Sequence, residues 1–497
     1  MKVINNNTSR NPFLHQLVLV VLLLACIGTC YADKKPPKNL FREKFSRKEI
    51  VKDISYIKSA LSIHPSLYES VSKEELDRKF SELESQLPDS LTRREFYNRV
   101  APIVASVKDG HTGLSLPNDF YYMHLDNGGT FFPFSVYMKN GRLFAGDSGK
   151  GEIPANSEIV SVNSIPVDRI VGKLLDNMGA FSLQYKYRTI EERFGKLLFD
   201  SYNFKDQFVI SYIDSDTGKE NTVKVKGKDK DLSRSRGFNY RVLESKVGYL
   251  EINDLVIQNW NEYQKMDTVV NQLFDSIGRS GIKDLIIDLR NNLGGSELVA
   301  KLFLKHLTKK PYTMVRKEIN YKLDRESRKF YRRQRRSVMN TLLFPLYPFF
   351  SWERHLYFSS KEIVDTWDIK ERSPRAVPDS LFFYGNKYVV FNTRTFSSAT
   401  EFANVFQHYG IAHTFGTETG CPVVQCGEAK SYFTPNVLLN IRVSSKKFWY
   451  PGSEDVEETG KNHGVIPDHI VEDDPFHFKD EKDPVIRSVF EFMRGRG

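Results

Sequence analysis

Two adjacent serines, Ser397 and Ser398, lie between an apolar run and a helical pattern, an arrangement that suits a nucleophile. The run 388–391 predicts a strand, and Ser398 with Glu401 fits the S-x-x-E capping box of the helix that follows. Ser397 is then expected on the strand-to-helix turn. A hydroxyl beside the unpaired N–H groups of a helix N-terminus has what acyl transfer needs. The same pattern also fits two serines that only form the turn and the cap.

Two further segments could complete such a site. Residues 283–289 predict a buried strand, and Gly294 and Gly295 follow in a loop that opens the next helix. Glycines let a backbone approach a substrate oxygen closely, which suits an oxyanion hole, although a packed turn would have the same pattern. His111 ends a helical region and could serve as a base, or could simply be structural.

Four motifs, taken in order, resemble those of the S41 serine peptidases, which include the C-terminal (tail-specific) processing proteases and their tricorn-core relatives. Residues 288–295 (DLRNNLGG) resemble the family's D-L-R-x-N-x-G-G, and the segment around Ser397 resembles its nucleophile motif. Residues 464–468 (GVIPD) resemble its closing G-V-x-P-D, and 109–112 (DGHT) resemble the D-G-H-T of the branch that uses histidine. The resemblance covers roughly 45–475.

The resemblance favours Ser397 over Ser398 as the nucleophile. In the tail-specific branch, a small residue follows the reactive serine six positions on, and Tyr-Gly follows at twelve and thirteen. Counted from Ser397, those positions hold Ala403, Tyr409 and Gly410, whereas counting from Ser398 misses them by one.

The remaining roles follow from the same resemblance. An oxyanion hole would combine the amide of Ser398 with that of Gly294 or Gly295. The tail-specific branch pairs its serine with a lysine twenty-five residues later, but Pro422 occupies that position, so a Ser-Lys dyad is not expected. His111 is the expected base, because an imidazole near neutrality can take the serine proton and return it to the leaving amine.

The acid that would orient His111 is left open. Tricorn-like enzymes place a Glu just before the closing motif, where this chain has Lys461. Glu458 is the preferred candidate, with Glu457 and Asp109 as alternatives. A solvated acidic loop explains the two glutamates equally well.

The elements that must position these residues form a mixed α/β protein. Residues 45–118 are predicted to be helical, with three capping boxes, and end in DGHT. Residues 119–235 are β-rich, and a strand–turn–strand at 155–167 resembles the core of a PDZ domain, a fold that captures peptides by strand addition. Residues 236–475 are expected to form an α/β, ClpP/crotonase-like S41 catalytic core. A basic insertion at about 308–380 interrupts this core.

The two ends of the chain lie outside these regions. Residues 1–32 have a short apolar run preceded by basic residues, which predicts a signal peptide followed by a linker at 33–44. We therefore expect an exported protein in the periplasm or cell envelope. Lipidation at Cys26 or Cys30 is an alternative. Residues 476–497 are expected to form a C-terminal tail.

The composition limits the kinds of molecule that the protein is expected to bind. With 40% hydrophobic and 27% charged residues, the chain has an ordinary soluble composition. Its net charge is +10, and the basic insertion suggests either a lid over a cleft or contact with an anionic membrane surface. Nucleic-acid binding is not expected, because the sequence has no recognisable nucleic-acid-binding fold. No cofactor or metal is implied. Cys421 and Cys426 form either a disulfide or two free thiols.

The sequence therefore predicts an exported serine endopeptidase that cleaves peptides or proteins through an acyl-enzyme, with Ser397 as nucleophile and His111 as base. The alternative is a non-catalytic peptide-binding or scaffold protein on the same fold. The oligomeric state and the cleavage preference are left open.

Overall fold

The computed structural model describes residues 42–146, 152–229, 236–243, 246–338, 363–474 and 482–495. The chain groups into two units, Met1–Glu43 and Lys44–Gly497, and the account below concerns the second. The predicted signal peptide at 1–32, with Cys26 and Cys30, lies outside the described residues, as does most of the predicted linker. The described part is mixed α/β, as expected.

The N-terminal region is helical as predicted. It contains the helices α2 (Arg47–Leu61), α3 (Lys73–Ser85) and α4 (Arg93–Ala105) and a small sheet of β1 (Lys44–Ser46) and β2 (Ser90–Thr92). Ser46 and Thr92 form complete capping boxes at α2 and α4, and the Ser72 side chain caps α3. These local signals act within four residues, which is why the sequence reveals them.

A short strand joins this region to the far end of the chain. β3 (Gly113–Ser115) follows the DGHT loop and pairs antiparallel with β19 (Asn440–Val443), which also pairs with β18 (Lys430–Phe433). Apolar residues of β19 complete the core of α2, α3 and α4. The loop that carries His111 is therefore anchored to residues more than 300 positions later.

The β-rich region is a sheet in the order β4-β5-β6-β8-β9, with β7 paired to β6. Its strands are β4 (Val136–Lys139), β5 (Arg142–Ala145), β6 (Glu158–Val162), β7 (Ile165–Pro166), β8 (Gln207–Ile213) and β9 (Glu220–Lys226), and its helices are α6 (Val167–Asp176) and α7 (Leu183–Tyr202). Asn140 and Gly141 take positive φ values and form the β4–β5 turn. The predicted strand–turn–strand and the helix after it are also present.

Helix α7 packs against the edge strand of this sheet. The Met138 amide on β4 donates to the Glu191 carboxylate on α7 at 2.8 Å. An incoming peptide strand would need that amide, because strand addition uses the open N–H groups of an edge. Peptide capture along β4 would therefore require α7 to move.

The catalytic region contains a six-stranded sheet in the order β10-β11-β12-β15-β16-β21. β10 (Phe238–Val242) runs antiparallel to β11 (Val247–Ile252), whereas β12 (Asp284–Asp288), β15 (Asn386–Phe391), β16 (His413–Gly416) and β21 (His469–Ile470) continue in parallel. β12 and β15 confirm the two strands predicted before the glycine loop and before Ser397.

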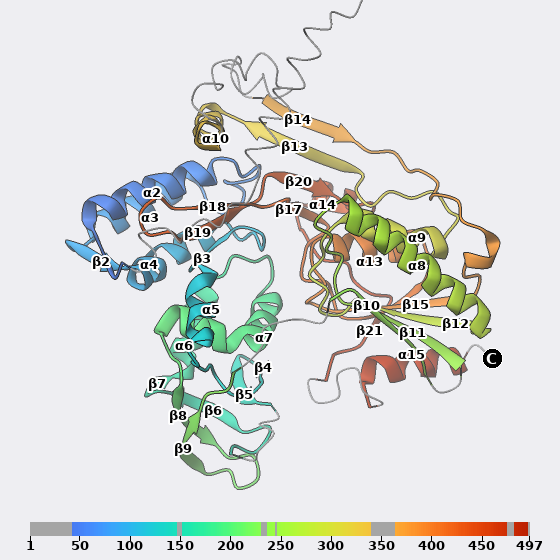
Figure 1. Ribbon diagram of the computed structural model, residues 1–497, viewed down its shortest axis with the longest axis horizontal. Helices are drawn as coiled ribbons and strands as arrows, with labels where there is room; N and C mark the ends of the chain where they lie inside the picture. The colour runs from blue at the N-terminus through green and yellow to red at the C-terminus, as the bar shows by residue number, and fades with distance from the viewer. Residues whose placement is uncertain are drawn as a thin grey trace, which may run out of the picture. The chain divides into compact units, whose positions relative to one another are not determined.

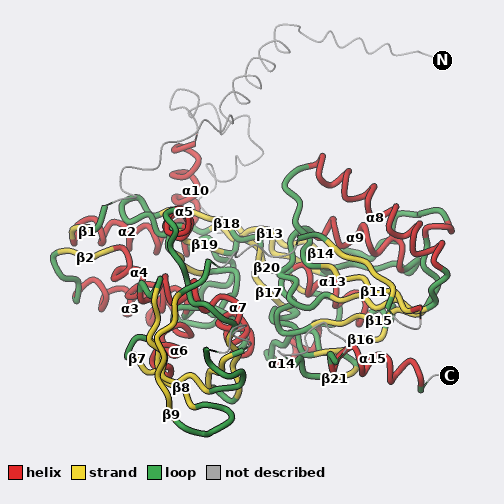
Figure 2. The backbone as a smooth tube through the Cα atoms, turned by 60° about the horizontal axis from the view of Figure 1, so that its bottom comes forward, coloured by secondary structure: helices red, strands yellow, loops and turns green. Residues whose placement is uncertain are grey.

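Helices cover both faces of this sheet (Figures 1 and 2). Alternate residues such as Leu250 and Ile287 pack with α8 (Trp260–Ser280), α9 (Glu297–Leu307) and α13 (Ser398–His408). Their neighbours, such as Tyr249 and Ile286, pack against α15 (Pro484–Arg494) on the other face. The residues predicted to form a C-terminal tail thus include a helix that belongs to the fold.

Part of the basic insertion is folded. β13 (Lys317–Leu323) pairs with β14 (Ile363–Asp368) and with β20 (Lys446–Trp449), which pairs with β17 (Val424–Gly427). After β13 comes α10 (Arg325–Val338), whose Phe330 ring packs against Tyr56 of α2 at 5.5 Å between centroids. Residues 339–362 lie outside the described part.

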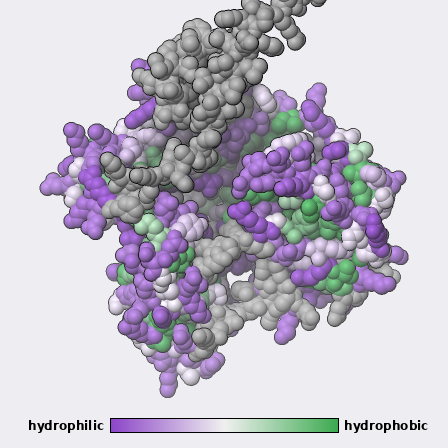
Figure 3. Space-filling view, viewed as in Figure 1, coloured by the Kyte–Doolittle hydropathy of each residue, from purple (hydrophilic) through white to green (hydrophobic). Residues whose placement is uncertain are grey.

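The visible face in Figure 3 is mostly hydrophilic, with scattered hydrophobic patches. Across the ranges that the structure describes, no helix combines the length and the hydrophobicity needed to span a membrane.

Candidate active site

Ser397 occupies a strained turn at the start of α13. Its φ of 55° and ψ of −132° lie in a region that residues with side chains rarely adopt, at a cost of about 1–3 kcal/mol. The helix begins at Ser398, so Ser397 is the N-cap, and its hydroxyl makes no capping bond. The prediction that Ser398 caps the helix through Glu401 is wrong, because Ser398 lies inside the helix. The Ser397 hydroxyl is consequently not used to cap α13.

The predicted glycine loop lies directly against this turn. A Cβ on Gly294 would lie 2.8 Å from the Ser398 nitrogen and 2.9 Å from Ser397 Cβ, and the φ of Gly294 is +87°. Only glycine fits there, because both the space and the backbone conformation exclude a side chain. The loop and the serine turn are therefore brought together as the sequence predicts.

The amides expected to form an oxyanion hole differ in whether they already have a hydrogen-bond acceptor. The Gly295 amide donates to Ser398 Oγ at 2.7 Å, and the Gly294 amide donates to Asn292 Oδ1 at 2.8 Å. The Ser398 amide belongs to the first turn of α13, where helical amides have no acceptor within the helix. Gly295 becomes available to a substrate oxygen only when Ser398 Oγ rotates away.

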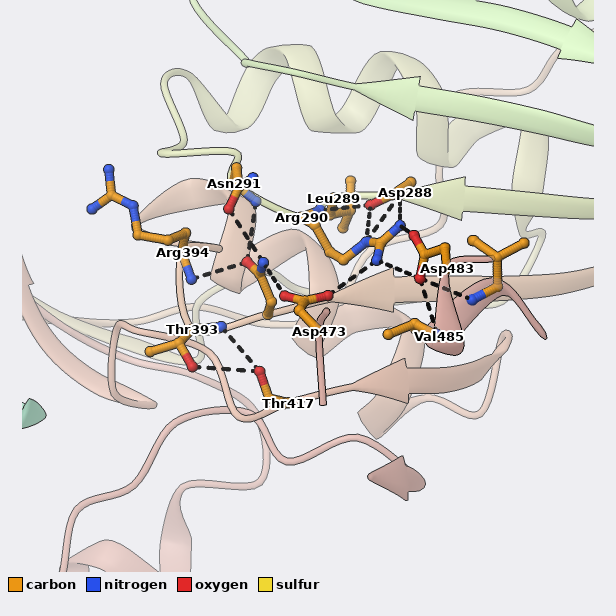
Figure 4. Close-up of polar contacts among 12 residues, drawn as sticks. Asp288, Leu289, Arg290, Asn291, Thr393, Arg394, Thr417, Asp473, Asp483 and Val485 are labelled. Carbon is orange, nitrogen blue, oxygen red and sulfur yellow. Dashed lines mark hydrogen bonds and ion pairs between the residues drawn. The ribbon is translucent and has the colours of Figure 1, made fainter. Parts of the chain in front are cut away.

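A buried ion cluster lies at the start of the loop that leads from β12 to the two glycines (Figure 4). The guanidinium of Arg290 contacts the carboxylates of Asp288, Asp473 and Asp483 at 2.7 to 3.0 Å. Although burial opposes its charge, these carboxylates raise the pKa of Arg290. The Asp288–Arg290 motif thus pairs internally, and it links the loop to the residues just before α15.

Helix α7 of the β-rich region holds the other side of the serine turn. Arg394 donates to Thr189 Oγ1 at 2.9 Å and forms an ion pair with Glu192. The Tyr185 ring stacks on the Phe396 ring with 4.7 Å between centroids. In Figure 4 the Arg394 side chain points away from the Arg290 cluster. No local pattern in the sequence reveals these contacts, because the partners lie about 200 residues apart.

His111 lies beside the residue that precedes Ser397. Its ring is 4.6 Å from the Phe396 ring, measured between centroids, and the side chain is buried. Its Nδ1 is buried without a hydrogen-bond partner among the described residues. Within that part of the chain, the Ser397 hydroxyl and the His111 ring are not hydrogen-bonded to each other. The structure places the predicted base at the serine turn but leaves one ring nitrogen unused.

Asp109 is the acid nearest to this ring. Its Oδ1 accepts the His111 backbone amide at 3.0 Å and lies 3.8 Å from Nδ1. Its Oδ2 accepts from Thr112 Oγ1 at 2.6 Å, Ser444 Oγ at 2.5 Å and His64 Nε2 at 3.1 Å. Although burial opposes ionisation, contacts with His111 and His64 hold the pKa of Asp109 well below its usual range. Sequence reasoning missed His64.

The preferred acid, Glu458, lies elsewhere. It is exposed on α14 (Glu454–Thr459), and no contact joins it to His111 within the described ranges. Glu457 pairs with Arg316 and Lys317 at 3.0 and 3.3 Å. The structure therefore brings Asp109 to the histidine and leaves both glutamates at the surface.

Comparison with known proteins assigns the family. Residues 246–471 match the model of peptidase family S41. This part of the chain belongs to that family. The S41 domain is a serine-type peptidase domain, and it contains Ser397, Ser398, Gly294 and Gly295.

Two solved structures of CPAF share the fold. Mature CPAF is 14% identical over 85% of this chain and 92% of its own, with a TM-score of 0.53. Mature CPAF complexed with lactacystin is 15% identical over 90% and 97%, with a TM-score of 0.54. The photosystem II D1 C-terminal processing protease is 13% identical over 85% and 93%, with a TM-score of 0.44. Among curated proteins, none matches this sequence.

Both cysteines near the S41 site are free thiols, which resolves the alternatives left open by the sequence. Cys421 is buried, and its thiol donates to Gln425 Oε1. Cys426 is half-buried.

Two cavities have linings that include neither Ser397 nor His111. One, of about 440 Å³, lies between α8, α9 and residues 369–375, and one of about 390 Å³ lies near His408. Within the described ranges, no group of three or more His, Cys, Asp or Glu side chains is placed to hold a metal ion.

Proposed function

We propose that this S41 peptidase is an exported endopeptidase in which Ser397 is the nucleophile and His111 the general base. The observation that carries the proposal is the strained Ser397, free of capping bonds, on a turn packed between the glycine loop and the His111 loop. Strain of this kind concentrates at functional sites, where surrounding contacts maintain it.

The reaction would follow the usual course of acyl transfer. His111 takes the Ser397 proton as Oγ attacks the peptide carbonyl, and the protonated imidazole then donates that proton to the leaving amine. The developing oxyanion is bound by the Ser398 amide and, after Ser398 Oγ turns aside, by the Gly295 amide. Water then hydrolyses the acyl-enzyme by the same proton transfers.

We assign Asp109, rather than Glu458, as the acid that orients His111. A proton on Nδ1 directed at Asp109 Oδ1, 3.8 Å away, leaves Nε2 to accept the serine proton. The low pKa of Asp109 supports this role, because the carboxylate stays charged beside the imidazolium that forms. A small shift of the ring would satisfy the unpartnered Nδ1.

The proposals for the location and the substrate are based on the sequence. The pattern of residues 1–32 supports export to the periplasm or cell envelope, and the exposed basic side chains of α10 support contact with an anionic membrane surface. The expected substrate is a peptide or an extended protein segment.

The test is digestion of a mixed peptide library by residues 33–497, read by mass spectrometry. The wild type is compared with Ser397→Ala and His111→Ala. Cleavage by the wild type alone supports the Ser-His assignment and gives the sequence preference. Cleavage that persists in His111→Ala would show that another residue is the general base.

One observation favours the non-catalytic alternative. Both glycine amides already have side-chain acceptors and Nδ1 of His111 has none, as in a scaffold that binds peptide without turning it over. Lactacystin, which is present in one similar CPAF structure, is a suitable probe. A covalent adduct on Ser397 would exclude the scaffold, whereas peptide binding that Ser397→Ala leaves unchanged, with no adduct, would support it.

A further inference from the structure

The two described ends of the basic insertion line the cavity of about 440 Å³. Residues 312–315 form one wall and residues 369–375 form another, and side chains of α8 and α9 complete the lining. The two walls are joined through their backbones, because the Tyr312 amide donates to the Arg372 carbonyl at 3.1 Å and the Arg372 amide donates to the Tyr312 carbonyl at 3.0 Å. The cavity is therefore built into the fold at the point where the insertion meets the catalytic region.

Part of the lining is apolar. Leu302, Met314 and Val315 line the cavity, and all three are more than nine-tenths buried. Leu298 lines it as well and is 41% exposed, so some of this apolar surface is open to solvent. Pockets that bind ligands in proteins have volumes of about 300–1,000 Å³ and are lined mainly by apolar side chains. The cavity therefore has the size and the surface to hold an apolar group.

The acidic side chains at the cavity already have cationic partners. Glu297 lines the cavity and pairs with Lys301 at 3.0 Å. Asp267 on α8 pairs through one carboxylate oxygen with Lys305 and through the other with Arg375, at 3.4 Å in the second pair. These three cations also line the cavity. Repulsion between the two acids and an anionic ligand is consequently reduced.

Two further cations line the cavity without an ion pair. Lys370 and Arg372 are both exposed, and no ion pair joins either side chain to another described residue. Tyr312 lies on the opposite wall and is 7% exposed, and its hydroxyl makes no hydrogen bond within the described part of the chain. Burial raises the pKa of Tyr312, so this hydroxyl stays protonated and can donate. A carboxylate would satisfy all three groups, because a charged oxygen accepts strong hydrogen bonds.

The cavity begins close to the proposed oxyanion hole. Glu297 and Leu298 line it, and they follow Gly295 in the chain by two and three residues. Because consecutive Cα atoms are about 3.8 Å apart, the Cα atoms of Gly295 and Glu297 lie within about 8 Å of each other. An extended peptide advances about 3.3 Å per residue, so it covers this distance in about two or three residues.

We propose that this cavity, called here the basic subsite, binds a peptide segment in which an apolar side chain lies next to an Asp or Glu. The apolar side chain packs against Leu298 and Leu302, and the carboxylate pairs with Lys370 and Arg372. A peptide is favoured over other anions because the subsite adjoins the glycine loop of a peptidase domain. The inference rests on the proposed function, since it assigns the subsite to the substrate of the same serine.

The test measures equilibrium binding of two peptides to the full chain carrying Ser397→Ala, which prevents cleavage. The peptides are Ala-Glu-Leu-Glu-Ala-Ala and Ala-Gln-Leu-Gln-Ala-Ala, each with an amidated C-terminus and a neutral fluorophore on the N-terminus for anisotropy. The Glu peptide should bind at least about threefold more tightly at low salt, because exposed ion pairs contribute modestly. The difference should shrink at high salt, since exposed charges are screened.

Variants then locate the difference. The double variant Lys370→Gln, Arg372→Gln should bind both peptides with the affinity of the Gln peptide. Tyr312→Phe should weaken binding of the Glu peptide alone, by at least about twofold, because it removes one hydrogen-bond donor. The matched control is Lys224→Gln with Lys226→Gln, which removes two exposed charges from β9 and should preserve the difference between the peptides.

Two results would overturn the inference. One is equal affinity for the two peptides, and the other is a difference that persists in Lys370→Gln, Arg372→Gln. Decanoate is tested as a simple amphipathic anion. If it binds, neither peptide does, and the double variant loses it, the cavity binds a free anion and the inference is likewise wrong.

Cleavage by the wild type separates this inference from the proposed function. The expected binding difference without any cleavage would overturn the proposed function and leave the basic subsite in place. Cleavage without the binding difference would overturn the basic subsite alone. When both hold, the cleaved library peptides should be enriched in Asp or Glu within about three residues of the cut, and the double variant should lose this enrichment.

Discussion

The serine turn and the histidine loop differ in how completely the fold determines them. The Ser397 turn is packed between the glycine loop and α7, and its backbone adopts a strained conformation. The His111 backbone amide is bonded to Asp109, but the ring Nδ1 has no hydrogen-bond partner among the described residues and lies 3.8 Å from the Asp109 carboxylate. The nucleophile is therefore preorganised in this structure, whereas the base requires a small movement to become aligned.

The largest expected effect separates the two serines. Ser397→Ala should abolish peptide cleavage, a loss of at least about 10³-fold, because the nucleophile is gone. Ser398→Ala should retain cleavage, because it removes only the hydroxyl that occupies the Gly295 amide. Initial rates on one cleaved peptide decide this, and the reverse ranking would exchange the roles of the two residues.

The next effect tests how tightly the serine turn is packed. Gly294→Ala introduces a Cβ within 3 Å of three neighbouring atoms at a φ of +87°, so cleavage should fall on the order of a hundredfold and stability by about 2–3 kcal/mol. Gly113→Ala is the matched control, because its Cβ would meet open space. Urea unfolding and cleavage rates measure both effects. Wild-type behaviour of Gly294→Ala would show that the turn is not rigid.

A smaller effect concerns the acid beside His111. Asp109→Asn removes the charge that would stabilise the imidazolium, so cleavage should fall about tenfold to a hundredfold, with a changed pH profile. Glu458→Gln, at an exposed position on α14, should leave the rate unchanged. If Glu458→Gln instead causes the larger loss, the acid is the one that the sequence favoured, and α14 must approach the site during turnover.

The last effect leaves the chemistry of the site aside and concerns stability alone. Burial raises the pKa of Glu401 from 4.5 to about 8, so the folded state binds its proton more tightly than the unfolded state. Protonation of Glu401 therefore contributes to the free energy of unfolding, and this contribution is complete below pH 4.5. It is lost as the pH rises to about 8, with a slope of about 1.4 kcal/mol per pH unit.

Glu401→Gln, which stays neutral, should remove that slope. The check is the midpoint of thermal unfolding between pH 5 and pH 9, with Glu458→Gln as an exposed control. A slope identical to that of the wild type would mean that Glu401 is ionised throughout this range.

The sequence predicts what neighbouring residues determine. Helix caps at Ser46 and Thr92, the strands before the glycine loop and before Ser397, and the hairpin at Asn140 depend on contacts within a few residues. The capping prediction at Ser398 failed because the N-cap is Ser397, one residue earlier, so that Ser398 lies inside the helix, where its hydroxyl accepts the distant Gly295 amide.

Other parts of the site have no local signal. His64 and Arg394 are assigned only once the fold brings distant segments together. The sequence favours Glu458 over Asp109 because of its position in the chain. In the structure, the surroundings of His111 are set instead by the pairing of β3 with β19.

The central claim is that Ser397 is the nucleophile and that His111 activates it. The most direct measurement treats wild-type residues 33–497 and the His111→Ala variant with a serine-directed fluorophosphonate. Mass spectrometry then maps the adduct, and its rate of formation is compared between the two proteins. The account predicts one adduct, on Ser397, formed at least about a hundredfold more slowly in His111→Ala. An adduct on Ser398, or labelling of Ser397 at the same rate in both proteins, would contradict it.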